Sequence, residues 1–439
     1  MYDCVPTWDL PQETGRVWLD EGETMVDQST VSDLAAEARL EDPAFYLGDP
    51  YPTYARLRRE APVYWCESGQ FWALSKHEDI IWAELQENPP FTTTQGLYIA
   101  EASQPTRVDE RDPSGTQQAG ASFMSDPPGH TAFRRMVGTA FTTPRMADLE
   151  PRIQSIASQL LDSLPEGEPV DFVEAVAVPL SIQVISGFLG VSNERWGDLR
   201  RWTDSFLLYL GGGLSEPEAE KAVADIAEMH SFWAESLAER LRNPQDDLMS
   251  NVAAMELDGE PLPVDSQVAI CLSVLTAGNE TTRNTLSGSM VTFAEHHDQW
   301  NKLVSDPSLV QGATEELLRW VSPVIHFGRR ATQPIVIRDQ EIAEGDFVAM
   351  LYGSANRDED IWADADVFDI TRDQEQKHLS FGWGVHRCIG AALGRAEIRI
   401  ALEELTKRFA GWEIAGPVKR HPSTLVNDYK SVPLTLKRN

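Results

Sequence analysis

The sequence predicts a mainly α-helical protein with small β-sheets, an α+β fold, on three observations. Apolar residues recur at helical spacing over 149–257, 266–296 and 391–409, which is the pattern of amphipathic or buried helices. Short runs of aromatic and β-branched residues bounded by turn residues, within 63–74 and 331–351, predict strands. The composition, 42% hydrophobic and 24% charged, is ordinary for a globular protein.

The 439 residues form one folded domain in our interpretation, because no repeat of fixed period and no low-complexity linker divides them. Residues 1–50 carry twelve acidic side chains against two arginines. We therefore expect residues 1–32 to be an acidic, partly ordered extension. Residues 33–439 are then the single domain.

Charge and composition argue against several classes of protein. The formal net charge of −32 disfavours a nucleic-acid partner and an anionic membrane, both of which attract basic surfaces. No apolar run approaches the roughly 20 residues needed to span a bilayer, and the first ten residues lack the pattern of a signal peptide. The four cysteines are scattered, unlike a disulfide framework. We expect a cytoplasmic monomer without membrane insertion.

The N-terminal part of the domain predicts short helices around a hairpin. A break at 49–52 precedes a helix at 53–60, a β-hairpin within 63–74 and a helix from about 76 to 85. From 88 to 125 the chain is polar and rich in Thr, Gly, Gln and Pro. A structureless segment of this length inside a compact domain is usually a functional loop.

Two later stretches combine a helix with a distinctive end. Residues 126–135 predict a turn followed by a helix, on which His130 and Arg134 share one face; alone, this is an ordinary solvated basic face. The apolar run 206–210 precedes three glycines at 211–213. It is either a lip beside a flexible hinge or a buried helix end.

The longest apolar-periodic segment, 266–296, predicts a helix buried around much of its circumference. Its middle reads Ala277-Gly278-Asn279-Glu280-Thr281-Thr282, and unpaired polar groups are costly inside a core. The Thr281 hydroxyl can bond the Ala277 carbonyl four residues earlier and open a groove in the helix. In isolation this hexamer is equally well a helix-packing glycine followed by solvent-facing polar residues.

A cysteine lies in a glycine-rich loop directly before the helix at 391–409. The loop reads Phe381-Gly382-Trp383-Gly384-Val385-His386-Arg387-Cys388-Ile389-Gly390. The start of the helix lowers the pKa of a neighbouring thiol and favours the thiolate, although a lone cysteine in a turn is often simply buried. Zinc is disfavoured, since Cys4, Cys66, Cys271 and Cys388 form no Cys-x-x-Cys pair.

The spacing Phe-Gly-x-Gly-x-His-x-Cys-x-Gly closely resembles the haem-binding loop of the cytochrome P450 family. The resemblance extends from about residue 49 to the C-terminus through four motifs in the same order. It implies a cytochrome P450 fold that holds haem b between a long distal helix and the proximal cysteine loop and helix. Cys388 is then the thiolate ligand of the iron, and Phe381, His386 and Gly390 are further haem-binding positions.

The resemblance also implies roles for residues outside the loop. Glu280 and Thr281 match the acid and alcohol that deliver protons to iron-bound dioxygen, beside Ala277. His130, Arg134 and Arg329 match the residues that bind the haem propionates, with Arg330 as the alternative to Arg329. Glu316 and Arg319 match the Glu-x-x-Arg helix, whose charges are joined by Arg372. The implied substrate-pocket positions are Leu97, Tyr98, Phe206, Val274, Val324, Ile325 and Val426.

The implied function is a monooxygenase that inserts one atom of O2 into a C–H bond of a small hydrophobic substrate. The stretches 277–284 and 354–360 resemble bacterial members that hydroxylate steroids, terpenoids and branched lipids. A tailoring hydroxylase of a secondary metabolite is the alternative substrate class. A peroxide-driven peroxygenase and a non-catalytic haem sensor are rival functions, of which Glu280 with Thr281 argues against the first.

The electron donor must be a separate protein, because nothing in the chain resembles a flavin or iron–sulfur module. Segment 372–408 carries seven basic and five acidic residues, and segment 131–147 carries three arginines and no acid. On a protein of net charge −32 this contrast predicts docking of an acidic ferredoxin, itself reduced by a ferredoxin reductase. The alternative is that structural ion pairs consume several of these arginines.

Overall fold

The structure is a computed structural model that describes residues 34–85, 90–102, 125–211, 215–257, 259–373 and 376–439. The predicted extension 1–32 and most of the loop 88–125 lie outside the described residues. The helices are α2 (Tyr51–Glu60), α3 (His77–Leu85), α4 (Gly129–Gly138), α5 (Thr143–Asp162), α6 (Val178–Leu189), α7 (Trp196–Gly211), α8 (Glu216–Arg242), α9 (Leu248–Ala253), α10 (Val264–Glu295), α11 (His297–Ser305), α12 (Val310–Val321), α13 (Tyr352–Ala355) and α14 (Ala391–Arg408).

The strands are short, and the predicted combination of helices with small sheets is confirmed. They are β1 (Val63–Cys66), β2 (Phe71–Leu74), β3 (Phe91–Thr92), β4 (Pro169–Asp171), β5 (Glu256–Leu257), β6 (Glu260–Pro261), β7 (His326–Ala331), β8 (Ile335–Ile337), β9 (Gln340–Ile342), β10 (Phe347–Leu351), β11 (Phe409–Ile414), β12 (Lys419–Arg420), β13 (Tyr429–Ser431) and β14 (Pro433–Arg438). Among the described helices, none is long and apolar enough to cross a membrane.

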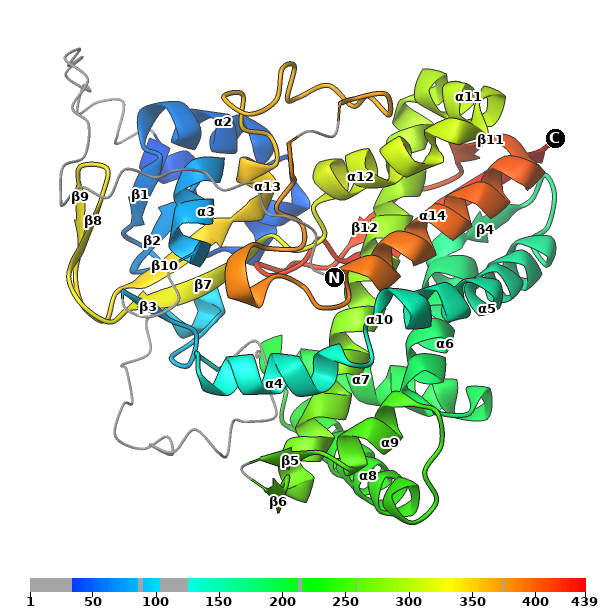
Figure 1. Cartoon of the computed structure of the whole chain (residues 1–439). Helices are drawn as coiled ribbons and strands as arrows, with labels where there is room; N and C mark the ends of the chain where they lie inside the picture. The colour runs from blue at the N-terminus through cyan, green and yellow to red at the C-terminus, as the bar shows by residue number, and fades with distance from the viewer. Residues whose placement is uncertain (1–33, 86–89, 103–124, 212–214, 258, 374–375) are drawn as a thin grey trace.

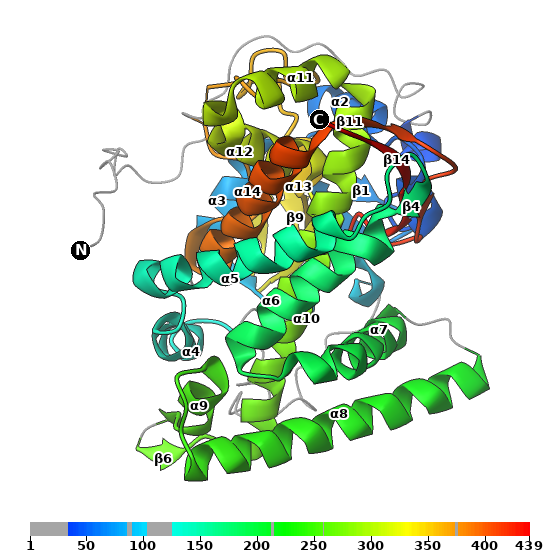
Figure 2. The same ribbon diagram turned by 90° about the vertical axis from the view of Figure 1, so that its right-hand side faces the viewer.

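Helix α10 is the axis of the helical region (Figure 1, Figure 2). It contacts α6, α8, α12 and α14, so most of its circumference is buried, as the length of its apolar pattern predicts. Helix α8 crosses one end of α10, and α14 runs along its flank (Figure 2). On α14 the predicted apolar face is buried at Ile398, Leu402 and Leu405, whereas Ala392 is exposed.

The sheet region lies on the other side of the molecule (Figure 1). Its five strands are ordered β1-β2-β10-β7-β3, and only the β10/β2 pair is parallel. Strand β10 pairs on both edges and is buried at all five positions, which explains its continuous apolar run. Helices α2 and α3 both contact α13 and share buried cores with the strands of this sheet. The predicted hairpin and both predicted helices are confirmed.

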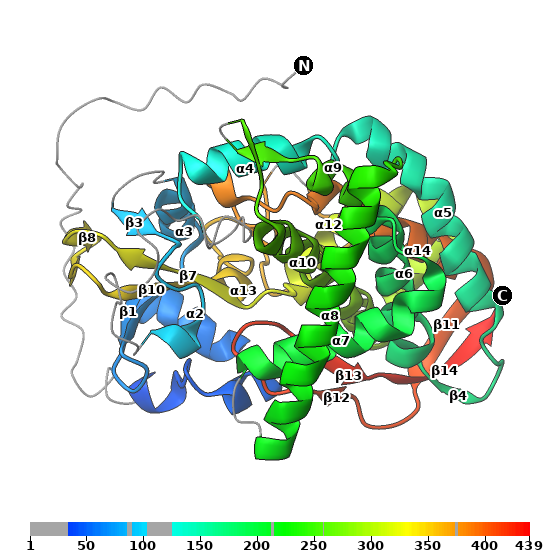
Figure 3. The same cartoon turned by 90° about the horizontal axis from the view of Figure 1, so that it is seen from below.

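Two smaller assemblies bring the C-terminus back to the middle of the chain. Strand β14 lies between β11 and β4, and a bridge joins Val324 to Val426. The segment before β13 therefore lies beside the start of β7, as seen from below in Figure 3. This return places β11 and β13 against α10.

Candidate functional site

The cysteine loop takes its shape from two glycines in the left-handed region of φ. Gly382 and Gly384 have φ values of 63° and 62°, which residues with a Cβ rarely adopt. A Cβ on Gly384 would lie 2.2 Å from the Glu84 carbonyl oxygen at the end of α3. The Cys388 amide donates to the Phe381 carbonyl at 2.8 Å and closes the loop. The sheet region thus supports the loop directly.

The Cys388 thiol is enclosed by protein atoms that desolvate it, yet its side chain keeps accessible surface. Burial raises the pKa of Cys388, while the Gly390 amide and the charges of Arg134, Arg387 and Arg395 act in the opposite direction. The helix start therefore favours the thiolate as expected, but desolvation outweighs it in the protein alone. A coordinating metal deprotonates a thiol outright, so the donor fits an iron ligand.

Helix α10 presents a less covered stripe on an otherwise buried surface. Ala277 is exposed, and Val274 and Thr281 are half-buried. The Thr281 hydroxyl donates to the Ala277 carbonyl at 2.9 Å, the bond that the sequence predicts. Gly278 faces the other way, because a Cβ there would lie 2.5 Å from Ile185 of α6. Gly278 is thus a helix-packing glycine, and the stripe consists of its neighbours.

Glu280 belongs to a buried ion-pair network. Arg283 contacts the Glu280 carboxylate and, at 3.1 Å, that of Asp428. The second Asp428 oxygen lies 3.1 Å from Lys430, whose side chain is 49% exposed. Burial raises the pKa of Glu280 and the Asp428 charge raises it further, whereas Arg283 lowers it. A carboxyl group with a raised pKa keeps its proton to higher pH than an ordinary carboxyl group and can pass it on.

Four basic side chains gather on the side of the cysteine loop that faces α4. This cationic cluster, whose positive charge comes from its two arginines, consists of His130, Arg134, Arg329 and His386. The rings of His130 and His386 lie 4.0 Å apart. Burial, together with the neighbouring arginines, lowers the pKa of His130 to about 4 and that of His386 to about 2. Nδ1 of His386 is buried without a hydrogen-bond partner among the described residues.

The cationic cluster fits a ligand that carries carboxylates, since guanidinium and imidazole groups pair with them. The buried acid beside it is Glu84, whose Oε1 lies 3.5 Å from Arg329. Arg330 points elsewhere and donates to the backbone carbonyls of Gln95, Glu101 and Gly345. Of the two arginines that the sequence left open, Arg329 therefore faces the cluster.

The structure brings Glu316 and Arg319 of α12 together with Arg372, which precedes the cysteine loop. Arg319 donates to both Glu316 oxygens at 2.8 Å, and Nε of Arg372 lies 3.3 Å from the same carboxylate. Arg319 also donates to the carbonyls of Asn356 and Ala365, each at 2.8 Å. The Glu316 carboxylate has no exposed surface. Removal of any one of these three charged groups would therefore leave a buried charge without its partner.

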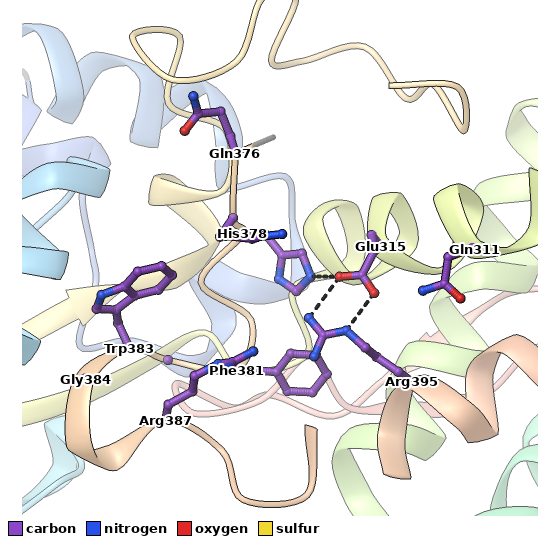
Figure 4. Close-up of a pocket in the computed structure, with 11 residues that line it drawn as sticks. Gln311, Glu315, Gln376, His378, Phe381, Trp383, Gly384, Arg387 and Arg395 are labelled. Carbon is purple, nitrogen blue, oxygen red and sulfur yellow. Dashed lines mark hydrogen bonds and ion pairs between the residues drawn. The ribbon is translucent and has the colours of Figure 1, made fainter. Parts of the chain in front are cut away.

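A pocket of about 530 Å³ opens between α12, the cysteine loop and α14 (Figure 4). The Glu315 carboxylate accepts a hydrogen bond from Nε of Arg395 at 2.6 Å and lies 3.2 Å from Nε2 of His378. Although burial opposes ionisation, hydrogen bonds from these two partners lower the pKa of Glu315 to about 2. The Arg395 guanidinium lies 4.4 Å from the ring centre of Phe381, which connects this pocket to the loop.

The predicted substrate-pocket residues are only partly brought together. Val324 bridges Val426, and the Leu97 carbonyl accepts a hydrogen bond from Gly328 at 2.8 Å. Phe206 and Val274 pack on the main helical core, while Val324 and Ile325 are buried in two cores of the sheet region. Tyr98 is half-buried on the segment that contains Leu97.

Comparison with known proteins identifies the family. The model of the cytochrome P450 family matches residues 191–424. Linalool 8-monooxygenase of Pseudomonas putida is 34% identical over 90% of this chain and 98% of its own length. A steroid C26-monooxygenase of Mycobacterium tuberculosis is 32% identical over 85% and 97%. The structure of cytochrome P450 CYP109Q5 from Chondromyces apiculatus matches with a TM-score of 0.78, at 32% identity over 91% and 98%.

The chain belongs to the cytochrome P450 family. It is a haem-thiolate monooxygenase, and its cofactor is a haem whose iron is ligated by a cysteine thiolate. When bound, the haem supplies the activation of dioxygen that the side chains of the protein cannot perform themselves. The family resemblance, the fold and the cofactor predicted from the sequence are thereby confirmed.

Some functional side chains carry no recognisable signal in the sequence. Glu84 lies on an ordinary amphipathic helix, yet its carboxylate accepts hydrogen bonds from Tyr352 and from the Trp383 amide. Asp428 and Arg283 are 145 positions apart.

Proposed function

We propose that Cys388 supplies the axial thiolate and that the cationic cluster binds the haem propionates. In this proposal Glu280 and Thr281 deliver protons to the reacting oxygen, and the triad around Glu316 holds the proximal loop. The observation that carries the assignment is the combination of an exposed cysteine residue, a desolvated cationic cluster beside it and a less covered stripe on α10.

A carbon monoxide difference spectrum tests the ligand. We expect Cys388→Ser to lose the thiolate band, while Cys66→Ser, at another free cysteine, keeps it. A reduced, folded Cys388→Ser variant with the wild-type band would overturn the assignment. NADPH-supported turnover with surrogate redox partners separates the monooxygenase from a haem sensor, which would bind ligand without forming product.

For the substrate we infer a steroid or terpenoid. Support comes from the names of the relatives, which act on linalool and on steroids, and from a similar structure that is a complex with testosterone (TM-score 0.76, 28% identity). Titration with sterols, terpenes, fatty acids and polyketides should give a low- to high-spin shift with at least one steroid or terpenoid. A shift with polyketides alone would favour a tailoring hydroxylase.

For the electron donor we infer an acidic ferredoxin that docks over the pocket of Figure 4. Part of the predicted basic excess is consumed, since Arg395 pairs with Glu315, Arg399 with Glu150 and Arg408 with Asp162. The side chains of Arg135 and Lys377 are exposed and available for steering.

Charge reversal tests this docking face. Arg135→Glu with Lys377→Glu should slow reduction by the ferredoxin at low salt and leave substrate titration intact. The control Arg59→Glu makes the same kind of charge change on α2, at a side chain that is 57% exposed. Equal effects of the face and control variants would place the partner elsewhere. The cytoplasmic location and the monomeric state stay predictions of the sequence.

A further inference from the structure

His326, the first residue of β7, is a fully buried polar side chain that the proposed mechanism does not use. Both of its ring nitrogens bond to the main chain. Nδ1 lies 2.7 Å from the Thr424 carbonyl oxygen, and Nε2 lies 3.1 Å from the Ile99 amide nitrogen. One imidazole therefore joins segments that are 98 and 227 positions away from it in the sequence.

The two partners fix the tautomer of His326. A backbone amide can only donate, so Nε2 is the acceptor for Ile99, and a carbonyl can only accept, so Nδ1 carries the proton. Only a neutral imidazole makes both bonds. Burial lowers the pKa of His326 to about 4, in agreement with this neutral form at physiological pH.

The joined segments are those that contain predicted substrate-pocket residues. Ile99 follows Leu97 and Tyr98, His326 follows Val324 and Ile325, and Thr424 precedes Val426. Main-chain hydrogen bonds also connect these segments in pairs, namely Gly328 to Leu97 and Ile325 to Leu425, each at 2.8 Å, and Asn427 to Pro323 at 2.9 Å. His326 adds a side chain that binds the segment of Ile99 and the segment of Thr424 at the same time.

We propose that His326 is a positioning residue that sets the spacing between segments 97–102 and 423–428, and thereby the shape of the substrate pocket. The role in specificity rests on the proposed function, whereas the anchoring does not. An apolar side chain could fill the same volume, but it would leave the Ile99 amide and the Thr424 carbonyl without partners. Buried backbone groups are almost always paired, so the segments would move.

Two amide side chains each reproduce one half of the imidazole. In His326→Asn the amide nitrogen can take the place of Nδ1 and keep the bond to Thr424, but nothing reaches Ile99. In His326→Gln the amide oxygen can take the place of Nε2 and accept from Ile99, but the bond to Thr424 is lost. His421→Asn, at an exposed histidine in the same C-terminal region, is the matched control.

Hydrogen exchange with mass spectrometry reads out the anchoring directly on the holoenzyme. We expect His326→Asn to speed exchange in 97–102, and His326→Gln in 423–428, by about tenfold, the effect of one lost hydrogen bond. The control should change neither segment. Unchanged exchange in both His326 variants, or equal acceleration of both segments in both variants, would overturn the anchoring role.

Titration with testosterone and with linalool tests the link to specificity. The dissociation constant of at least one of them should rise in both His326 variants while the carbon monoxide spectrum stays unchanged. If exchange changes as expected but neither dissociation constant does, the assignment of these segments to the pocket is wrong. If the wild-type protein gives no thiolate band in the carbon monoxide difference spectrum, the proposed function itself is overturned.

Discussion

Two buried ion-pair clusters in this protein share one sequence pattern but have opposite charge balance. Each begins with a glutamate and an arginine three residues apart on a helix and adds a residue from a remote segment. Around Glu316 two arginines share one carboxylate. Around Arg283 two carboxylates share one arginine.

The charge balance determines which cluster can exchange a proton. Arginine is always protonated in proteins, so around Glu316 two permanent cations hold one carboxylate, and we expect this cluster to serve as a structural clamp. The cluster around Arg283 has a carboxyl in excess, and burial raises the pKa of Glu280. It also continues to the partly exposed Lys430. We therefore expect the same local motif to make a structural clamp around Glu316 and a proton-binding site around Glu280.

The largest effect is expected from Glu316→Gln. The substitution leaves Arg319 and Arg372 without their carboxylate, and breaking a buried pair costs about 3–5 kcal/mol. Denaturant unfolding of the purified holoenzyme measures the loss. Glu403→Gln on α14, which breaks the more exposed pair with Arg399, should cost less than about 1 kcal/mol. Similar losses in the two variants would contradict a clamp.

Glu280→Gln should preserve the fold but impair turnover. The amide can still bond Arg283 but cannot carry a proton, so product formation should fall by about 10²-fold, the range for loss of a proton-transfer group. Consumed NADPH should appear as peroxide instead of product. Normal coupling between NADPH and product in this variant would remove Glu280 from the proton path.

Glu397 sharpens the comparison, because its carboxyl has no ion-pair partner among the described residues. On α14, its Oε2 is buried without a partner among the described residues, and burial raises its pKa. The native state then holds a proton that the unfolded chain releases above about pH 4.3, so stability falls as the pH rises. Glu397→Met should remove this slope and raise stability at pH 8 by about 1 kcal/mol.

Glu404, on the same helix, serves as the opposite control. Although burial opposes ionisation, hydrogen bonds from Lys407, Arg408 and Gln154 lower the pKa of Glu404. The stabilisation of the native state by ionised Glu404 is present above the pKa that this carboxyl has in the unfolded chain, and it is lost as the pH falls through the pKa in the folded protein. Glu404→Gln should therefore destabilise the protein at neutral pH. If Glu397→Met and Glu404→Gln change the free energy of unfolding in the same direction at pH 8, the explanation by charge balance is wrong.

The smallest effect is expected from Asp428→Asn. The Asp428 charge raises the pKa of Glu280, so its removal lowers that pKa and leaves Arg283 wholly to Glu280. The alkaline limb of the pH profile of product formation should move to lower pH, without loss of haem or of stability comparable with Glu316→Gln. A shift to higher pH would mean that Asp428 does not act on Glu280.

The sequence predicts most where the chemistry is local. The cysteine loop, the bond from Thr281 to Ala277 and the helix α10 all depend on neighbours within a few residues, so spacing alone reveals them. Glu84, Asp428 and the anchoring by His326 depend on contacts across more than 90 positions, and no periodicity encodes these. The basic excess of 372–408 was overestimated for the same reason, since Glu150, Asp162 and Glu315 lie outside that segment.

The way in which segment 95–102 is held has an evolutionary consequence. Arg330 binds the carbonyls of Gln95, Glu101 and Ala102, and His326 binds the amide of Ile99. Every residue offers a carbonyl and all but proline an amide, so these anchors tolerate new side chains in the segment they hold. A lineage can thus exchange the side chains at Leu97, Tyr98 and Ala100 without losing the attachment. Randomised libraries at these positions should retain more folded members with Arg330 and His326 intact than without them.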